Sequence, residues 1–369
     1  MTPPSTPKAA GFYMPAEWEP HAATWLGWPH NADDWPDKLP AIHWAYGEIV
    51  RHLAPGEVVR LLVNSAEQEE LAQSVLSRVG VDSSQVEFFR HPTNRGWTRD
   101  FGPIFVRSDD RTKLAIARFR FNAWAKYPDW ELDDRIPELL ANDLGLEAIP
   151  IQHVGRDIVL EGGAIDVNGS GTVITTEECL LDQEVQTRNP GLSREEIESV
   201  LCESLGVRNV IWLGRGIVGD DTHGHVDGYA LRESDNRSSS RRRRTHTIPI
   251  IILEENRERL EQARLEDGSP LEVVRLPMPA PLHFGVRLPA SYANFYIANV
   301  AVLVPTFNDP HDRIALNRLL LPDLFPDRPV IGIHAVDLVW GLGTLHCLTQ
   351  QQPMSAGFTE TSVATVPEL

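Results

Sequence analysis

Short apolar runs alternate with amphipathic stretches along nearly the whole chain. Five of the runs are rich in β-branched residues and end near Gly, Asn or Pro, as strands commonly do. They span residues 57–65, 113–121, 157–167, 171–181 and 295–305. Four stretches between them place apolar residues at helical spacing. They span residues 41–54, 66–80, 193–206 and 253–268. The alternation predicts a mixed α/β fold, and Ser193 followed by Glu196 predicts a capped helix start.

Polar residues with catalytic chemistry recur at a nearly constant spacing. Asp100 and Glu161 are 61 residues apart, and Glu161 and His225 are 64 apart. His225 and Cys347 are 122 apart, which is twice 61. The missing step falls near residue 286, close to the polar-aromatic segment 288–299. This spacing predicts five repeated α/β modules that close into a ring, each donating a group to a site on the axis.

Length and composition are those of an ordinary globular protein. The 369 residues are 42% hydrophobic and 23% charged. The chain has no run of about 18 apolar residues, so we expect no association with a membrane. Residues 1–10 have neither the basic nor the apolar region of a secretion signal. We predict a single catalytic domain over residues 11–353, between flexible tails at 1–10 and 354–369.

The net charge and the number of cysteines indicate which kinds of binding partner and which cellular compartment to expect. The formal charge is −18, from 34 basic and 52 acidic side chains. Such a field disfavours nucleic acid as a partner and permits a cationic substrate. Three cysteines cannot build a disulfide framework, and so few suit a reducing compartment, so we expect a cytoplasmic protein. They are Cys179, Cys202 and Cys347.

One segment lacks the pattern of the rest. Residues 231–247 read LRESDNRSSSRRRRTHT, with four consecutive arginines and no periodicity. A solvated loop or a disordered insertion is the plain interpretation. A tract that binds an anionic partner is a second interpretation, which the acidic charge of the whole chain disfavours.

Five polar islands carry candidate chemistry. They span residues 94–103, 160–181, 219–230, 288–299 and 341–353. In the third island His223, His225 and Asp227 alternate, so an extended strand would point all three to one face. In the fifth, Cys347 follows a Gly-x-Gly turn and precedes three glutamines.

Together these residues form a coherent nucleophilic site. Cys347 can attack as a thiolate, and the imidazolium of a neighbouring His225 would lower the pKa of the thiol. The same histidine can protonate a leaving group and then activate water, while Glu161 can orient the ring. Asp100 and Asp227 match a planar guanidinium, because each carboxylate accepts two parallel N–H bonds. Acceptors dominate this set, which indicates a donor-rich cation as the substrate.

Other interpretations are open at this point. Cys347 could be a small core residue, as most lone cysteines are. His223 and His225 could bind zinc in a metal-dependent amidohydrolase, although no second cluster with ligand spacing follows. A third alternative is a catalytically inactive binding protein of the same fold.

In this order, the islands resemble the agmatine deiminase and bacterial peptidylarginine deiminase family of the guanidino-group-modifying superfamily. The resemblance extends from about residue 12 to residue 353. The motifs that carry it are MPAEWEPHAATWLGWP (14–29), WTRDFGP (97–103), FNAW (121–124), LEGGAIDVNG (160–169), GDDTHGHVD (219–227), ASYANFYIAN (290–299) and LHCLTQQQP (345–353). It implies a five-bladed α/β propeller, the pentein fold with pseudo-fivefold symmetry, which agrees with the spacing.

The resemblance also implies a role for each island. Cys347 matches the nucleophile, His225 the acid/base, and Glu161 the carboxylate that supports the histidine. Asp100 and Asp227 match the carboxylates that hold the guanidinium. Further candidates for contact with the substrate are Trp97, Trp124 and Asn294.

The implied activity is hydrolysis of agmatine to N-carbamoylputrescine and ammonia, a step of putrescine biosynthesis. It proceeds through a covalent thiouronium intermediate and needs no metal or organic cofactor. Related enzymes are often dimers, so a homodimer is the assembly that the resemblance suggests.

Two departures from the family pattern matter. The family usually has Asp-Gly-His-Val-Asp and Gly-Gly-Asn-Ile-His-Cys, whereas this chain has HGHVD at 223–227 and GTLHC at 343–347. Another small guanidine or peptidyl-arginine is therefore an alternative substrate. Residues 231–252 replace a strand and an acidic loop of the family. Permitted codons for this stretch, read in shifted frames, encode family-like residues, so we hypothesise an out-of-frame segment that sequencing of the gene would test.

Overall fold

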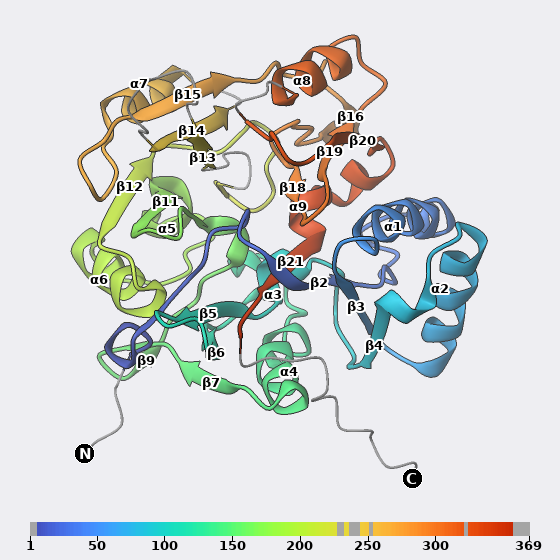
Figure 1. Ribbon diagram of the computed structural model, residues 1–369, viewed down its shortest axis with the longest axis horizontal. Helices are drawn as coiled ribbons and strands as arrows, with labels where there is room; N and C mark the ends of the chain where they lie inside the picture. Colours follow the sequence, from blue (N-terminus) through green and yellow to red (C-terminus); the bar gives the residue numbers. More distant parts are fainter. Residues whose placement is uncertain (1–5, 227–231, 236–243, 251–253, 321–323, 357–369) are drawn as a thin grey trace.

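A computed structural model describes residues 6–226, 232–235, 244–250, 254–320 and 324–356, with the backbone alone for 232–235 and 244–250. The strands in these ranges form five sheets of three or four strands. The sheets lie around a common centre (Figure 1). None of the helices in the described ranges is both long and apolar enough to cross a membrane.

Two of these five sheets contain four strands, and the other three contain three. The first sheet contains β21 (Thr349–Pro353), β2 (His21–Gly27), β3 (Val58–Val63) and β4 (Val86–Arg90). The second contains β1 (Phe12–Tyr13), β5 (Ile104–Ser108), β6 (Leu114–Arg118) and β7 (Glu147–Pro150). The third contains β10 (Asp166–Val167), β11 (Thr172–Thr176) and β12 (Asn209–Leu213). The fourth contains β13 (Arg232–Asp235), β14 (Arg244–Ile250) and β15 (Leu271–Arg275). The fifth contains β18 (Tyr296–Ile297), β19 (Val302–Thr306) and β20 (Val330–His334).

Helices connect the parallel strands and lie towards the outside of the molecule (Figure 1). They are α1 (Leu39–Leu53), α2 (Ala66–Arg78), α4 (Ile136–Leu144), α6 (Arg194–Leu205), α7 (Glu254–Gln262) and α8 (Asp312–Leu319). The short helix α5 (Glu177–Leu181) follows β11 directly and lies inside α6 (Figure 1). Two one-turn helices lie near the centre instead, α3 (Thr98–Phe101) and α9 (Leu345–Leu348). Two separate pairs complete the strands, β8 (Gln152–His153) with β9 (Arg156–Asp157), and β16 (His283–Phe284) with β17 (Val286–Arg287).

Each of the five sheets repeats one pattern. A first strand pairs antiparallel with a second, as β5 does with β6 and β18 with β19. A helical connection follows, and a third strand pairs parallel with the second, as β7 does with β6 and β20 with β19. The parallel pairs need such a crossover because a tight turn cannot reverse the chain twice. The predicted mixed α/β character is confirmed.

The candidate catalytic residues occupy equivalent places in this pattern. Asp100 lies in α3 just before β5, and Glu161 lies just before β10. His225 precedes β13, Asn294 precedes β18, and Cys347 lies in α9 just before β21. Each group therefore stands where the chain enters a new sheet from the centre. This position explains why the residues recur at nearly constant spacing.

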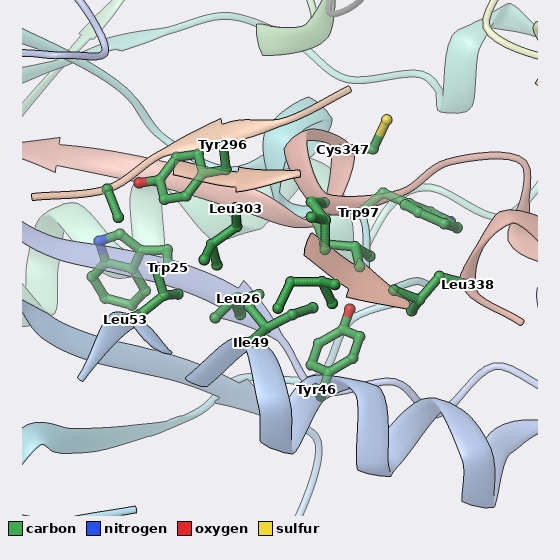
Figure 2. Close-up of a cluster of buried hydrophobic side chains, with 14 of the residues drawn as sticks. Trp25, Leu26, Tyr46, Ile49, Leu53, Trp97, Tyr296, Leu303, Leu338 and Cys347 are labelled. Atoms are coloured by element: carbon green, nitrogen blue, oxygen red, sulfur yellow. The ribbon is translucent and has the colours of Figure 1, made fainter. Parts of the chain in front are cut away.

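The largest apolar core lies beneath the nucleophile. Trp25 and Leu26 of β2, Ile49 of α1 and Leu303 of β19 are each fully buried in it. Burial of an aliphatic side chain of this size contributes about 1.5–3 kcal/mol. Figure 2 shows Cys347 at the edge of this cluster, with its sulfur pointing away from the aliphatic side chains. The core thus supports the segment that carries the thiol.

The helix capping predicted at Ser193 is confirmed. The Ser193 hydroxyl accepts from the Glu196 N–H at 3.3 Å, and the Glu196 carboxylate accepts from the Ser193 N–H at 2.8 Å. The helix ends at Gly206, whose φ is +69°. A Cβ there would lie 2.6 Å from the carbonyl oxygen of Phe12, so a glycine is required by both backbone and space.

Three predicted strands are shorter or broken in the structure. The run 157–167 is interrupted by a 3-10 turn, η5 (Gly162–Ala164), where the backbone passes close to Arg99. The run 171–181 changes from β11 to α5 at Thr176, whose side chain caps the helix. The run 295–305 is a hairpin of β18 and β19. Local apolar content does not distinguish these cases, because tertiary contacts decide where each strand stops.

The two ends of the chain also differ in part from the prediction. Residues 6–10 belong to a predicted flexible tail, but Thr6 donates to Glu203 of α6 at 3.1 Å, and η1 (Lys8–Ala10) follows. Residues 354–356 continue from β21, and the Ala356 N–H donates to the carbonyl of Arg111. The rest of both tails, and residues 227–231, 236–243 and 251–253 of the segment around 231–252, lie outside the described residues.

Candidate active site

A cavity of about 450 Å³ lies beside the nucleophile. Four of the residues that the sequence singled out line it, namely Cys347, Asp100, Trp97 and Trp124. A second, much smaller space is also lined by Cys347, together with His225 and Asn294. Glu161 is fully buried behind the histidine. Asp227 falls outside the described residues.

Cys347 lies in α9, after a tight turn. The turn passes through Leu342, whose φ is +69°, and Gly343. A Cβ at Gly343 would lie 2.8 Å from the Trp97 ring and 3.1 Å from the Cys347 sulfur, so this position admits only a hydrogen. The thiol is 8% exposed, and the Asn294 amide donates to it from Nδ2 at 3.0 Å. A donor aimed at the sulfur favours the thiolate over the thiol.

Asn294 is itself held in that orientation. Its Oδ1 accepts from the Thr344 hydroxyl at 2.7 Å and from the His346 N–H at 3.1 Å, which leaves Nδ2 facing Cys347. The sequence predicted a contact of Asn294 with the substrate. The structure places its amide donor against the Cys347 sulfur, because both donors to the amide oxygen belong to the turn before Cys347. The contact with the substrate stays a prediction.

The ring of His225 lies between two carboxylates. Nδ1 is 3.6 Å from Asp100 Oδ1, and Nε2 is 3.6 Å from Glu161 Oε2. The side chain is 2% exposed. Burial alone would lower the pKa of His225, but the charge of Asp100 and the proximity of Cys179 and Glu161 outweigh it and raise the pKa well above its ordinary value. These neighbours favour the protonated form of the ring over the neutral one.

Glu161 is kept ionised by a second partner. Arg188 donates from Nε to Glu161 Oε1 at 3.1 Å, and both side chains are fully buried. Burial opposes ionisation of the carboxyl, but the charge of Arg188, its hydrogen bond and the nearby His225 ring lower the pKa of Glu161 to about 2. A buried carboxylate of this kind requires a cationic partner. Arg188 supplies it while leaving Oε2 for the histidine.

Asp100 is positioned by two donors. The Trp124 indole donates from Nε1 to Oδ2 at 2.9 Å, and the Gly163 N–H donates to Oδ1 at 3.2 Å. Trp124 lies in a turn in which Ala123, Trp124 and Ala125 all have positive φ, between 48° and 59°. Non-glycine residues adopt this conformation at an energetic cost, and such strain gathers at functional sites. Here the strained turn brings the indole to the carboxylate.

Carboxylates dominate the wall of the cavity. Among the described residues that line it, five are acidic and one, Arg95, is basic; the acidic ones are Asp33, Asp34, Asp100, Asp129 and Asp221. Asp34 pairs with Arg95 and accepts from the Trp97 indole at 3.2 Å. Burial outweighs the charge of Arg95 and raises the pKa of Asp34 to about 6. The wall therefore suits a ligand that is positively charged along its length.

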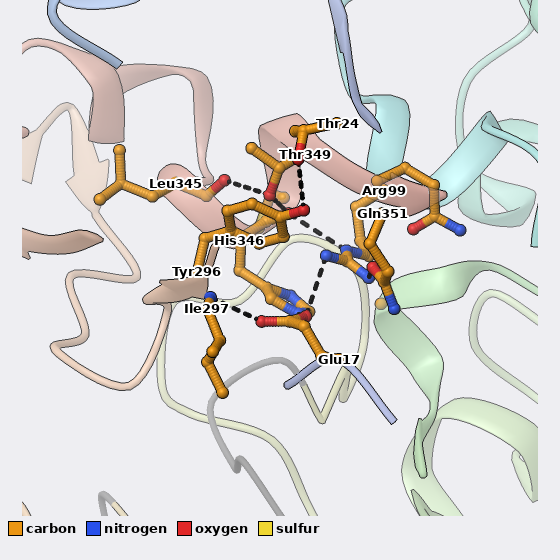
Figure 3. Close-up of polar contacts among 12 residues, drawn as sticks. Glu17, Thr24, Arg99, Tyr296, Ile297, Leu345, His346, Thr349 and Gln351 are labelled. Atoms are coloured by element: carbon orange, nitrogen blue, oxygen red, sulfur yellow. Dashed lines mark hydrogen bonds and ion pairs between the residues drawn. The ribbon is translucent and has the colours of Figure 1, made fainter. Parts of the chain in front are cut away.

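A buried carboxylate from the N-terminal segment joins α3 to α9 (Figure 3). Glu17 Oε2 is 2.8 Å from His346 Nε2 and 3.1 Å from the Arg99 guanidinium. Arg99 also donates to Gln351 Oε1 at 2.7 Å and to the His346 carbonyl at 3.2 Å. His346 precedes Cys347 and Arg99 precedes Asp100. Glu17 thus fixes the segments that carry Cys347 and Asp100 relative to each other.

The predicted alternation of His223, His225 and Asp227 in a strand is wrong over its described part. Residues 219–225 form turns, and His223 has a φ of +61°. Its Nε2 lies 2.8 Å from Asp182, away from the carboxylates that flank His225. The two histidines therefore do not converge on one ligand position, which is unfavourable for the zinc alternative based on this pair.

The sequence model of the Porphyromonas-type peptidyl-arginine deiminases matches residues 13–353. The chain belongs to this family. Agmatine deiminase of Stutzerimonas stutzeri (strain A1501) is 34% identical over 386 residues, which cover 95% of this chain and 97% of that protein. Agmatine deiminase of Pseudomonas syringae pv. tomato is 35% identical over 382 residues, with 95% and 97% covered.

Solved structures of the deiminase family have the same fold. Agmatine deiminase of Enterococcus faecalis superimposes with a TM-score of 0.83 at 30% identity, over 95% of this chain and 98% of that one. The C. jejuni agmatine deiminase with substrate bound gives a TM-score of 0.77 at 29% identity, over 93% and 97%. The protein is accordingly a member of a family of hydrolases that act on amidines.

Three residues of the deiminase site escaped prediction from the sequence. Arg188 could have been sought as the cation that a buried Glu161 requires, although nothing in its own segment marks it. Asp34 lies in the acidic stretch NADDWPD, which carries no periodic signal. Glu17 lies inside a motif that supported the resemblance, but the residues next to it in the sequence do not show that it pairs with Arg99 and His346. Their roles depend on contacts between distant segments.

One group in the site has the donor types of a metal centre. Ligand atoms of Glu161, Cys179 and His225 all lie within 4.8 Å of one another and are buried. Arg188 already neutralises Glu161, and Asp100 faces the other side of the His225 ring. Two cationic and two anionic groups therefore balance, so we interpret this group as an acid/base network.

Proposed function

We propose that this protein hydrolyses the guanidinium group of agmatine to N-carbamoylputrescine and ammonia. The observation that carries the proposal is the cavity in which Cys347 and Asp100 share a wall with four further carboxylates. Agmatine carries a guanidinium at one end and an ammonium at the other, so both ends meet negative charge. Agmatine deiminases that are 34–35% identical over nearly the whole chain support the same substrate.

We also propose that the five sheets are the blades of an α/β propeller with pseudo-fivefold symmetry. The repeated order of strand, strand, helix and strand supports this interpretation, as does the place of each catalytic candidate before the first strand of its sheet. In this arrangement the axis gathers one group from each blade.

In the first half of the reaction, the Cys347 thiolate attacks the guanidinium carbon. Asp100 holds the guanidinium by accepting its N–H bonds, and Asp227 is proposed as the second such acceptor from the family motif. The carbon becomes tetrahedral as the C–S bond forms. Its C–N bond to the terminal amino group then breaks, and His225 gives that nitrogen a proton so that ammonia leaves. The product of this half is an S-alkylthiouronium on Cys347.

In the second half, water replaces the sulfur. His225, now neutral, takes a proton from water, whose oxygen adds to the thiouronium carbon. The C–S bond then breaks and re-forms the Cys347 thiolate, while the hydroxyl oxygen gives up its remaining proton to solvent and becomes the carbonyl of the ureido group of N-carbamoylputrescine. Glu161 stabilises the imidazolium as it re-forms, because its Oε2 faces Nε2 of the ring. One water is consumed and one ammonia is released per cycle.

The acidic wall also sets the order of preference among guanidines. Free arginine would place its α-carboxylate in a cavity whose described lining carries five carboxylates and one arginine. A peptidyl-arginine would place neutral backbone groups there and lose the attraction of the distal charge. Agmatine is therefore expected to have the highest kcat/KM of the three.

Ammonia release from agmatine, arginine and a short arginyl peptide tests the proposal. Turnover of agmatine is expected, and Cys347→Ala is expected to abolish it, because the variant lacks the nucleophile. A preference for arginine or the peptide would replace agmatine with one of the alternative substrates. No turnover of any of the three by well-folded protein would favour an inactive member of the family, and the assay would then be repeated with family residues at 231–252.

A further inference from the structure

Behind the His225 ring lies a buried thiol that the proposed reaction does not use. Cys179 belongs to α5 and is 1% exposed. Its sulfur lies within 4.8 Å of a ring nitrogen of His225 and of a carboxylate oxygen of Glu161. Within the described residues, neither nitrogen of His225 nor Oε2 of Glu161 has a partner at hydrogen-bonding distance. The sulfur therefore lies near a ring whose N–H groups have carboxylate oxygens at 3.6 Å but no partner at hydrogen-bonding distance among the described residues.

The backbone around Cys179 is built to hold this arrangement. The Cys179 N–H donates to the Thr176 side chain at 3.0 Å, which caps α5. The same Thr176 hydroxyl donates to the carbonyl of Gly224 at 2.5 Å. Gly224 precedes His225, so one side chain ties the segment of the thiol to the segment of the imidazole. The proximity of the thiol to the imidazole is therefore set by hydrogen bonds of the backbone and not by apolar packing alone.

A buried cysteine in an apolar environment usually serves only to fill space. Cys179 does pack within an apolar cluster that includes Val173 and Leu180. Its sulfur, however, adjoins an imidazole and a carboxylate at the edge of that cluster. A merely space-filling residue would make stability depend on its volume but would leave the protonation of His225 unchanged.

We propose that Cys179 is a positioning residue for His225. The polarisable sulfur of Cys179 stabilises the imidazolium and holds the ring between Asp100 and Glu161. The inference rests on the proposed function, because it assumes that His225 is the acid of the deiminase reaction. Sulfur is a weak hydrogen-bond acceptor, and its partial negative charge favours the protonated ring over the neutral one.

Several charged or titratable groups face His225 from the surrounding elements. They are Asp100 from α3, Glu161 before η5, Cys179 from α5, Arg188 in the loop after α5, Asp220 at the backbone N–H of His225, and Cys347 across the smaller cavity. The Cys179 sulfur, within 4.8 Å of the ring, acts in the same direction as the two carboxylates and raises the pKa of His225. Loss of the sulfur is therefore expected to release the proton of His225 at lower pH.

The test compares Cys179→Ala with Cys179→Ser in the full-length protein. The alanine variant is expected to shift the alkaline limb of the kcat/KM profile for agmatine down by about 0.5–1 pH unit, equivalent to a threefold to tenfold loss above that limb. Serine keeps a polar atom at the position and is expected to retain most of the wild-type profile. Cys202→Ala is the matched control, since this half-buried thiol belongs to α6 and does not touch the site.

A measurement that needs no substrate separates this proposal from the assignment of agmatine. Titration of the His225 ring by NMR, assigned with His225→Gln, is expected to show a lower pKa in Cys179→Ala than in wild type. An unchanged His225 titration, or a kcat/KM profile lowered at every pH without a shift, would overturn the positioning role and leave Cys179 as a core residue. If wild type does not hydrolyse agmatine, the NMR titration still decides the role of Cys179.

Discussion

At the scale of single residues, two side chains in the site each stabilise the charged form of one neighbouring residue. Asn294 turns its amide donor toward the Cys347 sulfur, because its oxygen is occupied by Thr344 and the His346 N–H. Glu161 divides its two oxygens between Arg188 and His225. In each case one polar atom of the side chain is held by a neighbour, and this orients the other polar atom toward Cys347 or His225.

The first prediction concerns Asn294→Ala. Loss of the donor is expected to destabilise the thiolate and lower kcat by about 10-fold to 100-fold, which corresponds to about 1.5–3 kcal/mol for a hydrogen bond to a charged group. The rate of Cys347 alkylation by iodoacetamide at neutral pH, followed by mass spectrometry, checks the cause directly. Asn299→Ala is a matched control, because the Asn299 amide donates to the carbonyls of His21 and Gly56 and not to the thiol. Equal alkylation rates in wild type and Asn294→Ala would contradict the prediction.

At the scale of elements, one-turn helices and tight turns place the candidate catalytic groups, whereas the long helices support the sheets. α3 and α9 carry Asp100 and Cys347, and both contain only four residues. They are too short to be stable alone, so packing against neighbouring segments holds them. The turn before α9 depends on Gly343, where a Cβ would meet both the Trp97 ring and Cys347.

The second prediction concerns Gly343→Ala. The added methyl group is expected to push α9 away from Trp97 and displace the thiol, so kcat should fall by at least 10-fold, and overpacking should destabilise the protein by about 1–3 kcal/mol. Gly268→Ala is the control, since it strains a φ of +80° where space is open and far from the site. The control is expected to lose stability but keep kcat. A Gly343→Ala variant with wild-type kcat would show that the turn tolerates a shift.

At the scale of the whole molecule, buried ion pairs connect the segments that meet at the centre. Glu17, near the N-terminus, bridges Arg99 and His346, which are 247 residues apart in the chain. Burial opposes ionisation of Glu17, but the charges of His346 and Arg99 and hydrogen bonds lower its pKa to about 2. The pKa of Glu161 is lowered to the same value by its own partners. Folding and ionisation are therefore linked at the centre of the protein.

The third prediction follows from this linkage. A carboxyl whose pKa is lower in the folded than in the unfolded state stabilises the protein above its unfolded pKa, near 4.5, and loses that contribution as pH falls towards 2. Each of the two shifts corresponds to about 3 kcal/mol at neutral pH. Wild type is therefore expected to lose stability steeply below pH 4.5, as measured by urea unfolding between pH 7 and pH 3.

Glu17→Gln isolates one of the two contributions. The variant is expected to be less stable than wild type at pH 7, and the difference should shrink as pH falls, because the wild-type carboxyl becomes protonated there. Glu147→Gln, at the exposed start of β7, serves as the control and should follow wild type at every pH. A constant difference between Glu17→Gln and wild type across the range would assign the effect to packing rather than charge.

Much of the fold and of the site was predictable from sequence for a physical reason. Helices such as α1 and α6 have strong periodicity, and the capping of α6 is local, so neighbours in sequence decide them. The positions of Asp100, Glu161, His225 and Cys347 repeat because each lies at the same point of a repeated unit. The contact of the Asn294 amide with Cys347, by contrast, could not be predicted, because the orientation of the amide depends on the turn before Cys347.

The α/β class, the repeated unit and the residue types that can attack and hold a guanidinium are already contained in the sequence. These follow from periodicity, spacing and side-chain chemistry, which are properties of short segments. The folded chain adds that Arg188 neutralises Glu161, that Glu17 joins α3 to α9, and that Cys179 lies behind His225. Side chains become buried and form ion pairs when segments distant in the chain meet. No local sequence pattern therefore shows which two buried charged residues will be neighbours.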